Sequence, residues 1–85
     1  MTVTAPEWLT KHNGELRASQ DGRSWMVYFA GQMQYAIVPT PAGGKHACKV
    51  TQTNNGNRVD GPTTYPSVED AARGGLEDLR KAMGW

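Results

Sequence analysis

The sequence has a single cysteine and almost no net charge, and each of these features argues against a class of protein. Cys48 cannot form an internal disulfide, whereas small secreted domains usually need several. A formal net charge of +1 gives no electrostatic argument for a nucleic acid or a membrane surface as partner. Residues 1–20 contain no apolar signal segment, and no apolar run approaches the roughly 18 residues of a membrane span. We therefore expect a cytoplasmic protein with a free thiol.

The abundance of turn-forming residues sets the expected fold class. The 85 residues include ten glycines and five prolines, which is typical of short strands joined by tight turns. A chain of this length forms about one domain and buries only roughly 60 to 65% of its unfolded surface. We predict a single domain over residues 1–85 with an α+β fold. In this fold an antiparallel sheet of three to five short strands packs against a C-terminal helix, and a short N-terminal helix precedes the sheet.

Capping signals predict the N-terminal helix. Thr4 and Glu7 have the spacing of a capping box, in which each side chain accepts a hydrogen bond from the other residue's backbone N–H. The helix that follows would carry Trp8 and Leu9 and end near Asn13, just before a glycine. At about two turns it would be marginal unless it docks on the rest of the domain.

The C-terminal helix has stronger signals at both ends. Ser67 is a good N-cap, and Gly84 can adopt the left-handed conformation that ends helices. Between them, residues at three- and four-residue spacing form one apolar stripe: Val68, Ala71, Ala72, Gly75, Leu76, Leu79 and Met83. Gly74 and Gly75 each cost the helix about 1 kcal/mol relative to alanine. We expect Gly75 to let the helix approach the sheet closely, and the alternative is a hinge.

Three glycine-containing pairs predict hairpins: Asp21-Gly22, Gly31-Gln32 and Asn55-Gly56. A type I′ turn at the first pair sets Arg17 opposite Met26. A type II′ turn at the second pair, with glycine first, sets Tyr28 opposite Tyr35. These two turns therefore fix which residues share a face of the sheet.

The third hairpin lies in the second half of the sequence. It would join a strand over about residues 47–54 to a short strand over about residues 57–60. The second of these strands is expected at an edge of the sheet. The segment from Pro39 to Lys45 is expected to be a loop.

The stretch from Ser24 to Val38 is apolar on both of its expected faces. A strand with one solvated face should alternate apolar and polar residues, yet residues 25–30 are apolar without a break. In the predicted register the second face is a candidate interaction face: Arg17, Met26, Tyr28, Met33, Tyr35 and Ile37. Two interpretations stay open. Either Trp8 and Leu9 or the curl of the sheet buries this face, or it is exposed for a protein partner or for self-association.

A third interpretation makes the same face a nucleic-acid platform. Tyr28 and Tyr35 would stack on bases, while phosphate contacts would come from four cations: Arg17, Arg23, Lys49 and Arg58. The order helix, strands, helix resembles the double-stranded RNA-binding domain. That family binds phosphates with lysines at the start of its second helix, where this chain has the acidic stretch Ser67-Val68-Glu69-Asp70. A three-stranded sheet with a helix is also similar to the integrase arm domain and the plant AP2 domain, and this resemblance implies DNA binding through the sheet.

No motif predicts catalysis, a metal or a cofactor. His46 and Cys48 lie two apart on an expected strand and share a face, which would permit a Cys–His pair. Structural zinc needs four ligands, and His12 brings the candidates only to three. We therefore predict a protein that is not an enzyme and binds neither metal nor membrane. It would be a small binding module for a protein partner or for self-association, with nucleic-acid binding as the alternative.

Overall fold

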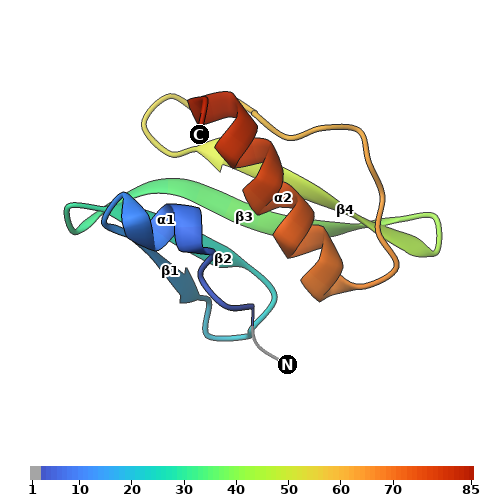
Figure 1. Cartoon of the computed structure of the whole chain (residues 1–85). Coiled ribbons are helices and arrows are strands. Elements are labelled where there is room, and N and C mark those ends of the chain that lie inside the picture. The colour runs from blue at the N-terminus through green and yellow to red at the C-terminus, as the bar shows by residue number, and fades with distance from the viewer. Residues whose placement is uncertain (1–2) are drawn as a thin grey trace.

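The computed structural model describes residues 3–85, which form two helices and one four-stranded antiparallel sheet. The elements in chain order are α1 (Glu7–Lys11), β1 (Gly14–Ala18), β2 (Trp25–Phe29), β3 (Gln32–Ala42), β4 (Lys45–Gln52) and α2 (Val68–Met83). The strands lie in sequence order, β1-β2-β3-β4, so each connection is a hairpin (Figure 1). The predicted α+β fold with its two helices is confirmed.

Helix α2 begins and ends at the residues that the sequence indicates. The Ser67 side chain accepts a hydrogen bond from the Asp70 N–H at 3.1 Å. At the other end Gly84 has a φ of 75°, and the next N–H, that of Trp85, donates to the Arg80 carbonyl at 3.0 Å. This pattern is a Schellman ending, which occupies carbonyls that the helix itself leaves without partners.

Helix α1 is formed, but not by the predicted capping box. Pro6 is its N-cap residue, and no side chain caps the helix. The chain leaves the helix through Asn13, whose φ of 61° is left-handed. A helix of five residues has little stability of its own, so tertiary contacts must hold it.

Trp85 supplies part of that tertiary support. Its ring stacks on the His12 ring with centroids 3.7 Å apart and an angle of 2° between the planes. The Trp8 and Phe29 rings lie 5.9 and 5.8 Å from the Trp85 ring. Trp85, two residues after the end of α2, therefore holds α1 against the end of β2.

Both helices cover the same face of the sheet. Leu9 of α1 and Leu79 of α2 are fully buried in one cluster with Val27, Ile37 and Val50 of the strands. Figure 1 shows α1 and α2 together in front of the sheet. The interpretation in which the N-terminal segment covers the second face is therefore wrong.

The first hairpin has the predicted register. Arg17 pairs with Met26, and Leu16 pairs with Val27. The turn itself is longer than predicted, because the last hydrogen bond before the loop runs from the Ser19 N–H to the Ser24 carbonyl at 2.8 Å. A four-residue loop and a two-residue turn centred on the same point give the same pairing.

The second turn lies one residue earlier than predicted. Ala30 and Gly31 both have positive φ values, 54° and 77°, which is the pattern of a type I′ turn. Phe29 therefore pairs with Gln32, so the predicted Gly31-Gln32 turn is wrong. A left-handed alanine is uncommon, and for this reason the sequence favoured the later position.

A β-bulge then changes the register along β3. Tyr28 pairs with Met33, but the next pair is Val27 with Tyr35, so Gln34 is the extra residue. Tyr28 and Tyr35 are therefore not opposite one another as predicted. Val27 and Tyr28 are adjacent on β2 and point to opposite faces, so their partners Tyr35 and Met33 also lie on different faces.

The third turn forms, but the strand predicted after it does not. Gly56 has a φ of 73°, and the Gln52 N–H donates to the Asn57 carbonyl at 2.8 Å. The segment that follows makes one isolated bridge, Thr51 with Arg58, instead of a strand over residues 57–60. It runs along the outer edge of β4 before the chain crosses to α2.

Glycines allow α2 to lie close to the sheet. A Cβ atom added at Gly75 would overlap the Cys48 Sγ atom and lie 3.1 Å from Val50 Cγ2. A Cβ atom at Gly74 would overlap the Tyr65 ring. The interpretation of Gly75 as a close-approach residue is confirmed.

Candidate functional site

The sheet face opposite the helices is the candidate functional site, and we call it the open face. Cross-strand pairing and alternation place on it a set of apolar side chains: Met26, Tyr28, Met33, Ala36, Val38 and Ala47. All are half-buried except Met33, which is 39% exposed. Neither helix covers them, so their partial burial comes from one another and from the strands.

Charged residues lie on both sides of these apolar residues. Glu15 and Arg17 belong to the same face on β1, and Lys49 belongs to it on β4. Lys45, at the start of β4, lies on the same face as Lys49, so three cations and one carboxylate give the strands a formal charge of +2 on the open face. Three strand spacings separate β1 from β4, which is about 14 Å.

Arg17 is fixed in place by two neighbours. Its Nε donates to Glu15 Oε1 at 2.8 Å, and this hydrogen bond lowers the pKa of Glu15. The Arg17 Cζ atom lies 4.2 Å from the centre of the Tyr28 ring, a cation–π contact. One side of the Tyr28 ring is thereby occupied by a guanidinium.

Four of the six predicted face residues lie together, and two do not. Arg17, Met26, Tyr28 and Met33 are on the open face, whereas the bulge places Tyr35 and Ile37 under the helices. Ile37 is fully buried in the core, and Tyr35 packs against the core cluster. Assigning either residue to an exposed face was therefore wrong.

Sequence reasoning missed Ala36 and Val38, which occupy the places on the open face that it gave to Tyr35 and Ile37. The position of the turn does not explain this, because a turn at Ala30-Gly31 leaves Tyr35 and Ile37 on the same face as the predicted turn does; only the bulge moves them to the other face. Nothing local marks Gln34 as the extra residue of the bulge.

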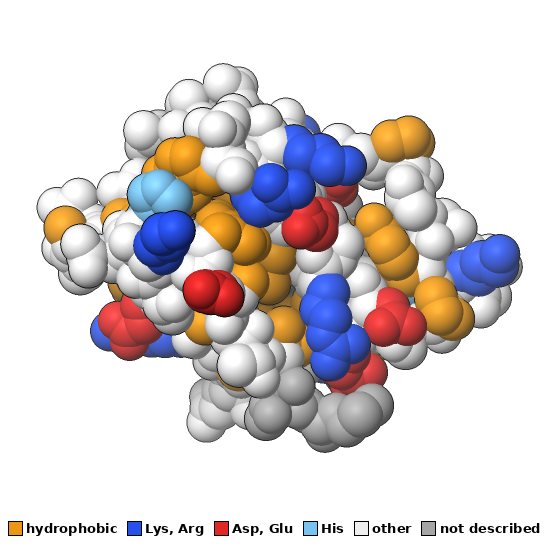
Figure 2. Space-filling model, in the orientation of Figure 1, with side chains coloured by type: hydrophobic (Ala, Val, Ile, Leu, Met, Phe, Trp, Pro, Cys, Tyr) orange, Lys and Arg blue, Asp and Glu red, His pale blue; other side chains and the backbone are white. Residues whose placement is uncertain are grey.

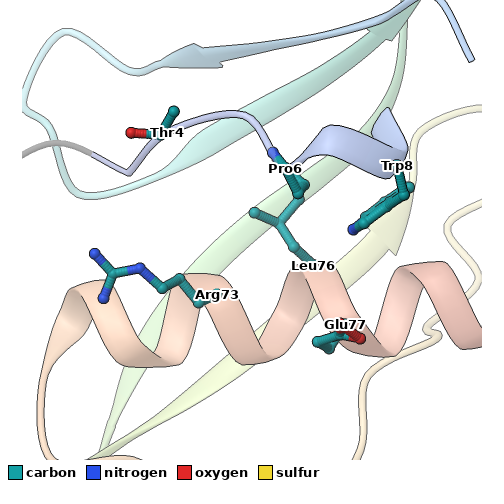
Figure 3. Close-up of a pocket in the computed structure, with 6 residues that line it drawn as sticks. All are labelled: Thr4, Pro6, Trp8, Arg73, Leu76 and Glu77. Carbon is teal, nitrogen blue, oxygen red and sulfur yellow. The ribbon is translucent and has the colours of Figure 1, made fainter. Parts of the chain in front are cut away.

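A cleft lies on the helix side, between α2 and the segment before α1. It encloses about 260 Å³, with the Trp8 ring and Leu76 on its walls and Arg73 and Glu77 at its rim (Figure 3). Figure 2 shows it as an apolar seam between charged side chains. Trp8 and Leu76 give the cleft apolar walls, but few polar groups converge there to orient a small molecule.

Cys48 and His46 lie on the helix side of β4. Cys48 is buried under α2, and burial raises the pKa of its thiol to about 12, with Asp60 and Asp78 adding to the shift. The backbone of His46 is bridged to that of Tyr65 by two hydrogen bonds of 2.8 and 2.7 Å. A protonated, buried thiol is not a nucleophile at neutral pH.

Two features are absent from the part of the chain that the structure describes. Within residues 3–85, no group of three or more His, Cys, Asp or Glu side chains is placed to hold a metal ion. No helix in the same range combines the length and apolar character of a membrane span.

No protein-family model, curated protein or solved structure matches the chain.

Proposed function

We propose that the protein is a non-enzymatic binding module that binds a protein partner through the open face. One observation carries this proposal: both helices lie on one side of the sheet, and the other side presents apolar side chains from three strands. Methionine and tyrosine make adaptable contact surfaces, and Met33 is exposed at the end of this one.

The occupant of the open face is an amphipathic helix of the partner protein. Sheets pack well against helices, as this sheet already does on its other face. The cations Arg17 and Lys49 lie about 14 Å apart across the strands, and a helix with its side chains is about 10–12 Å wide. A helix lying along the strands would place its apolar stripe on Met26, Ala36 and Val38. Acidic residues beside that stripe would meet the two cations.

Nucleic acid is the weaker candidate for the same surface. The proposed stacking pair is divided, because Tyr28 and Tyr35 lie on opposite faces of the sheet. Arg17 covers part of the Tyr28 ring, and Arg58 is bound to Asp60 at 2.6 Å. Affinity for phosphates requires several cations that are free to bind them.

The experiment uses a photo-crosslinking amino acid at residue 33 on the open face, with residue 81 on the exposed side of α2 as its control. Protein captured only through residue 33 is identified, purified and titrated against defined variants. We expect Lys49→Glu and Met33→Ser each to weaken its binding about tenfold, because one reverses an ion pair and the other removes apolar contact area.

Lys81→Glu is the matched control, since it makes the same charge change on the opposite side of the molecule. Binding by this variant should stay within about twofold of the original protein. The proposal is wrong if Lys49→Glu and Lys81→Glu bind alike. It is equally wrong if residue 33 crosslinks to nucleic acid, or if the crosslinked segment of the partner is not helical.

A further inference from the structure

The two edges of the sheet are treated differently by the chain. Along β4 the outward backbone groups of three residues have partners: the Val50 N–H donates to Asp60 Oδ1 at 3.0 Å, and the Val59 N–H donates to the Val50 carbonyl at 3.0 Å. The Gln52 N–H donates to the Asn57 carbonyl, and His46 exchanges two hydrogen bonds with Tyr65. This edge is closed by the segment that leads to α2. Closing an edge in this way prevents it from pairing with another chain.

No segment within residues 3–85 forms such hydrogen bonds along the edge of β1. The Ser19 N–H bonds to the Ser24 carbonyl, and hydrogen-bonded pairs recur at every second residue of an antiparallel ladder. The backbone groups of Glu15 and Arg17 therefore point toward β2, while those of Gly14, Leu16 and Ala18 point outward. Among the hydrogen bonds formed within residues 3–85, none uses the outward groups of these three residues. Figure 1 shows β1 as the outermost strand on its side of the sheet.

We propose that two copies of this chain pair antiparallel through β1, across a two-fold axis at Leu16. Leu16 would then exchange two hydrogen bonds with Leu16 of the second copy, and Gly14 would pair with its Ala18. The result is a continuous eight-stranded sheet.

The charges of Glu15 and Arg17 favour this register over the two registers in which the axis is moved by one residue. With the axis at Leu16, Glu15 of each copy lies opposite Arg17 of the other, so the dimer contains two ion pairs. Moving the axis by one residue sets Glu15 opposite Glu15, or Arg17 opposite Arg17. Like charges directly opposite one another destabilise a sheet, whereas opposite charges stabilise it.

The geometry of the pairing also favours these contacts. Glu15 and Arg17 would form a non-hydrogen-bonded pair, in which the Cα atoms are only about 4.5 Å apart and the side chains are closest. The Arg17 guanidinium has five N–H donors. It can therefore keep Glu15 and Tyr28 of its own chain and also bind the second copy's carboxylate. The pairing uses the edge of the sheet and does not depend on the proposed function of the open face.

The test is sedimentation equilibrium of the full chain over a wide concentration range, at low salt, with three charge variants. Glu15→Arg and Arg17→Glu each create two like-charge pairs per dimer and should weaken dimerisation at least about tenfold. The double variant E15R/R17E restores opposite charges and should dimerise about as well as the original chain. The double variant E77R/R80E is the matched control, because it exchanges an exposed ion pair on α2 and should leave the dimer unchanged.

Amide hydrogen exchange of the original chain gives a second readout, because it reports pairing of the β1 backbone directly and needs no substitution. The Leu16 and Ala18 amides point away from β2, so they exchange rapidly in the monomer and should become protected as protein concentration rises. The Met26 amide, inside the sheet, should be protected at all concentrations. A chain that stays monomeric at millimolar concentration overturns the proposal. A dimer that E15R/R17E fails to restore, or one in which Leu16 stays unprotected, overturns it as well.

Discussion

Replacing Gly75 by alanine tests the close packing of α2 on the sheet. In a solvent-exposed helix this change would add about 1 kcal/mol of stability. Here the new methyl group would overlap Cys48 Sγ and lie 3.1 Å from Val50 Cγ2 and 3.3 Å from Cys48 Cβ. Three contacts to two buried side chains place the overpacking cost near the top of the usual range, at about 3 kcal/mol. We therefore expect a net loss of about 2 kcal/mol.

The assay is urea unfolding followed by tryptophan fluorescence, with thermal melting as a check. A loss of about 2 kcal/mol lowers the melting temperature of a domain this small by roughly 8–16 °C. In a Cys48→Ala background the Gly75→Ala cost should fall, since the overlapped sulfur is gone. A Gly75→Ala protein more stable than the original would refute the close approach.

Two further predictions concern Asp60 and Cys48. The hydrogen bond from Arg58 holds the pKa of Asp60 at about 2, below its ordinary 3.8. The stability that Asp60 adds is therefore complete above about pH 4 and is lost as the pH falls toward 2. The difference in urea midpoint between the original chain and Asp60→Asn should be clear at pH 6 and small at pH 2, and a constant difference would contradict this. Because burial raises the Cys48 pKa to about 12, iodoacetamide at pH 7.5 should react about a thousandfold more slowly with native than with urea-unfolded protein. Comparable rates would show that the thiol is accessible and would reopen the question of a nucleophile.

The features that the sequence predicted correctly are those with local chemical causes. The ends of α2 follow from Ser67 and Gly84, which act through hydrogen bonds and backbone conformation within one turn of their own positions. The β1–β2 register follows from the position of the loop around Asp21-Gly22 and from matching alternation in the two strands. Neither prediction needed any knowledge of the remainder of the domain.

The features that it missed depend on contacts distant in sequence. Thr4 and Glu7 have a capping-box spacing, but Pro6 is the N-cap residue, and α1 is held on the sheet by the burial of Leu9. The side of the sheet on which α1 docks is set by that same core, and no local pattern reports it. The left-handed conformation of Ala30 is likewise unfavourable in itself and persists only because the register of the sheet requires it.

The bulge at Gln34 decides what the open face contains. Without it, the Ala30-Gly31 turn would carry its pairing along β3 and place Ala36 and Val38 under the helices, with Tyr35 and Ile37 outside. Exchanging a buried isoleucine for a buried alanine would cost the core roughly 1.5–3 kcal/mol in transfer free energy. Because Ile37 pairs with Val50, the flip would also turn β4 over and remove the surface on which Gly75 packs.

The same bulge leaves small residues in the middle of the open face. Ala36 and Val38 lie between the larger side chains of Met26 on β2 and Lys49 on β4. A sheet face that is low at its centre and higher at its margins is shaped to receive the convex surface of a helix. One inserted residue therefore completes the core on one side of the sheet and shapes the proposed binding surface on the other.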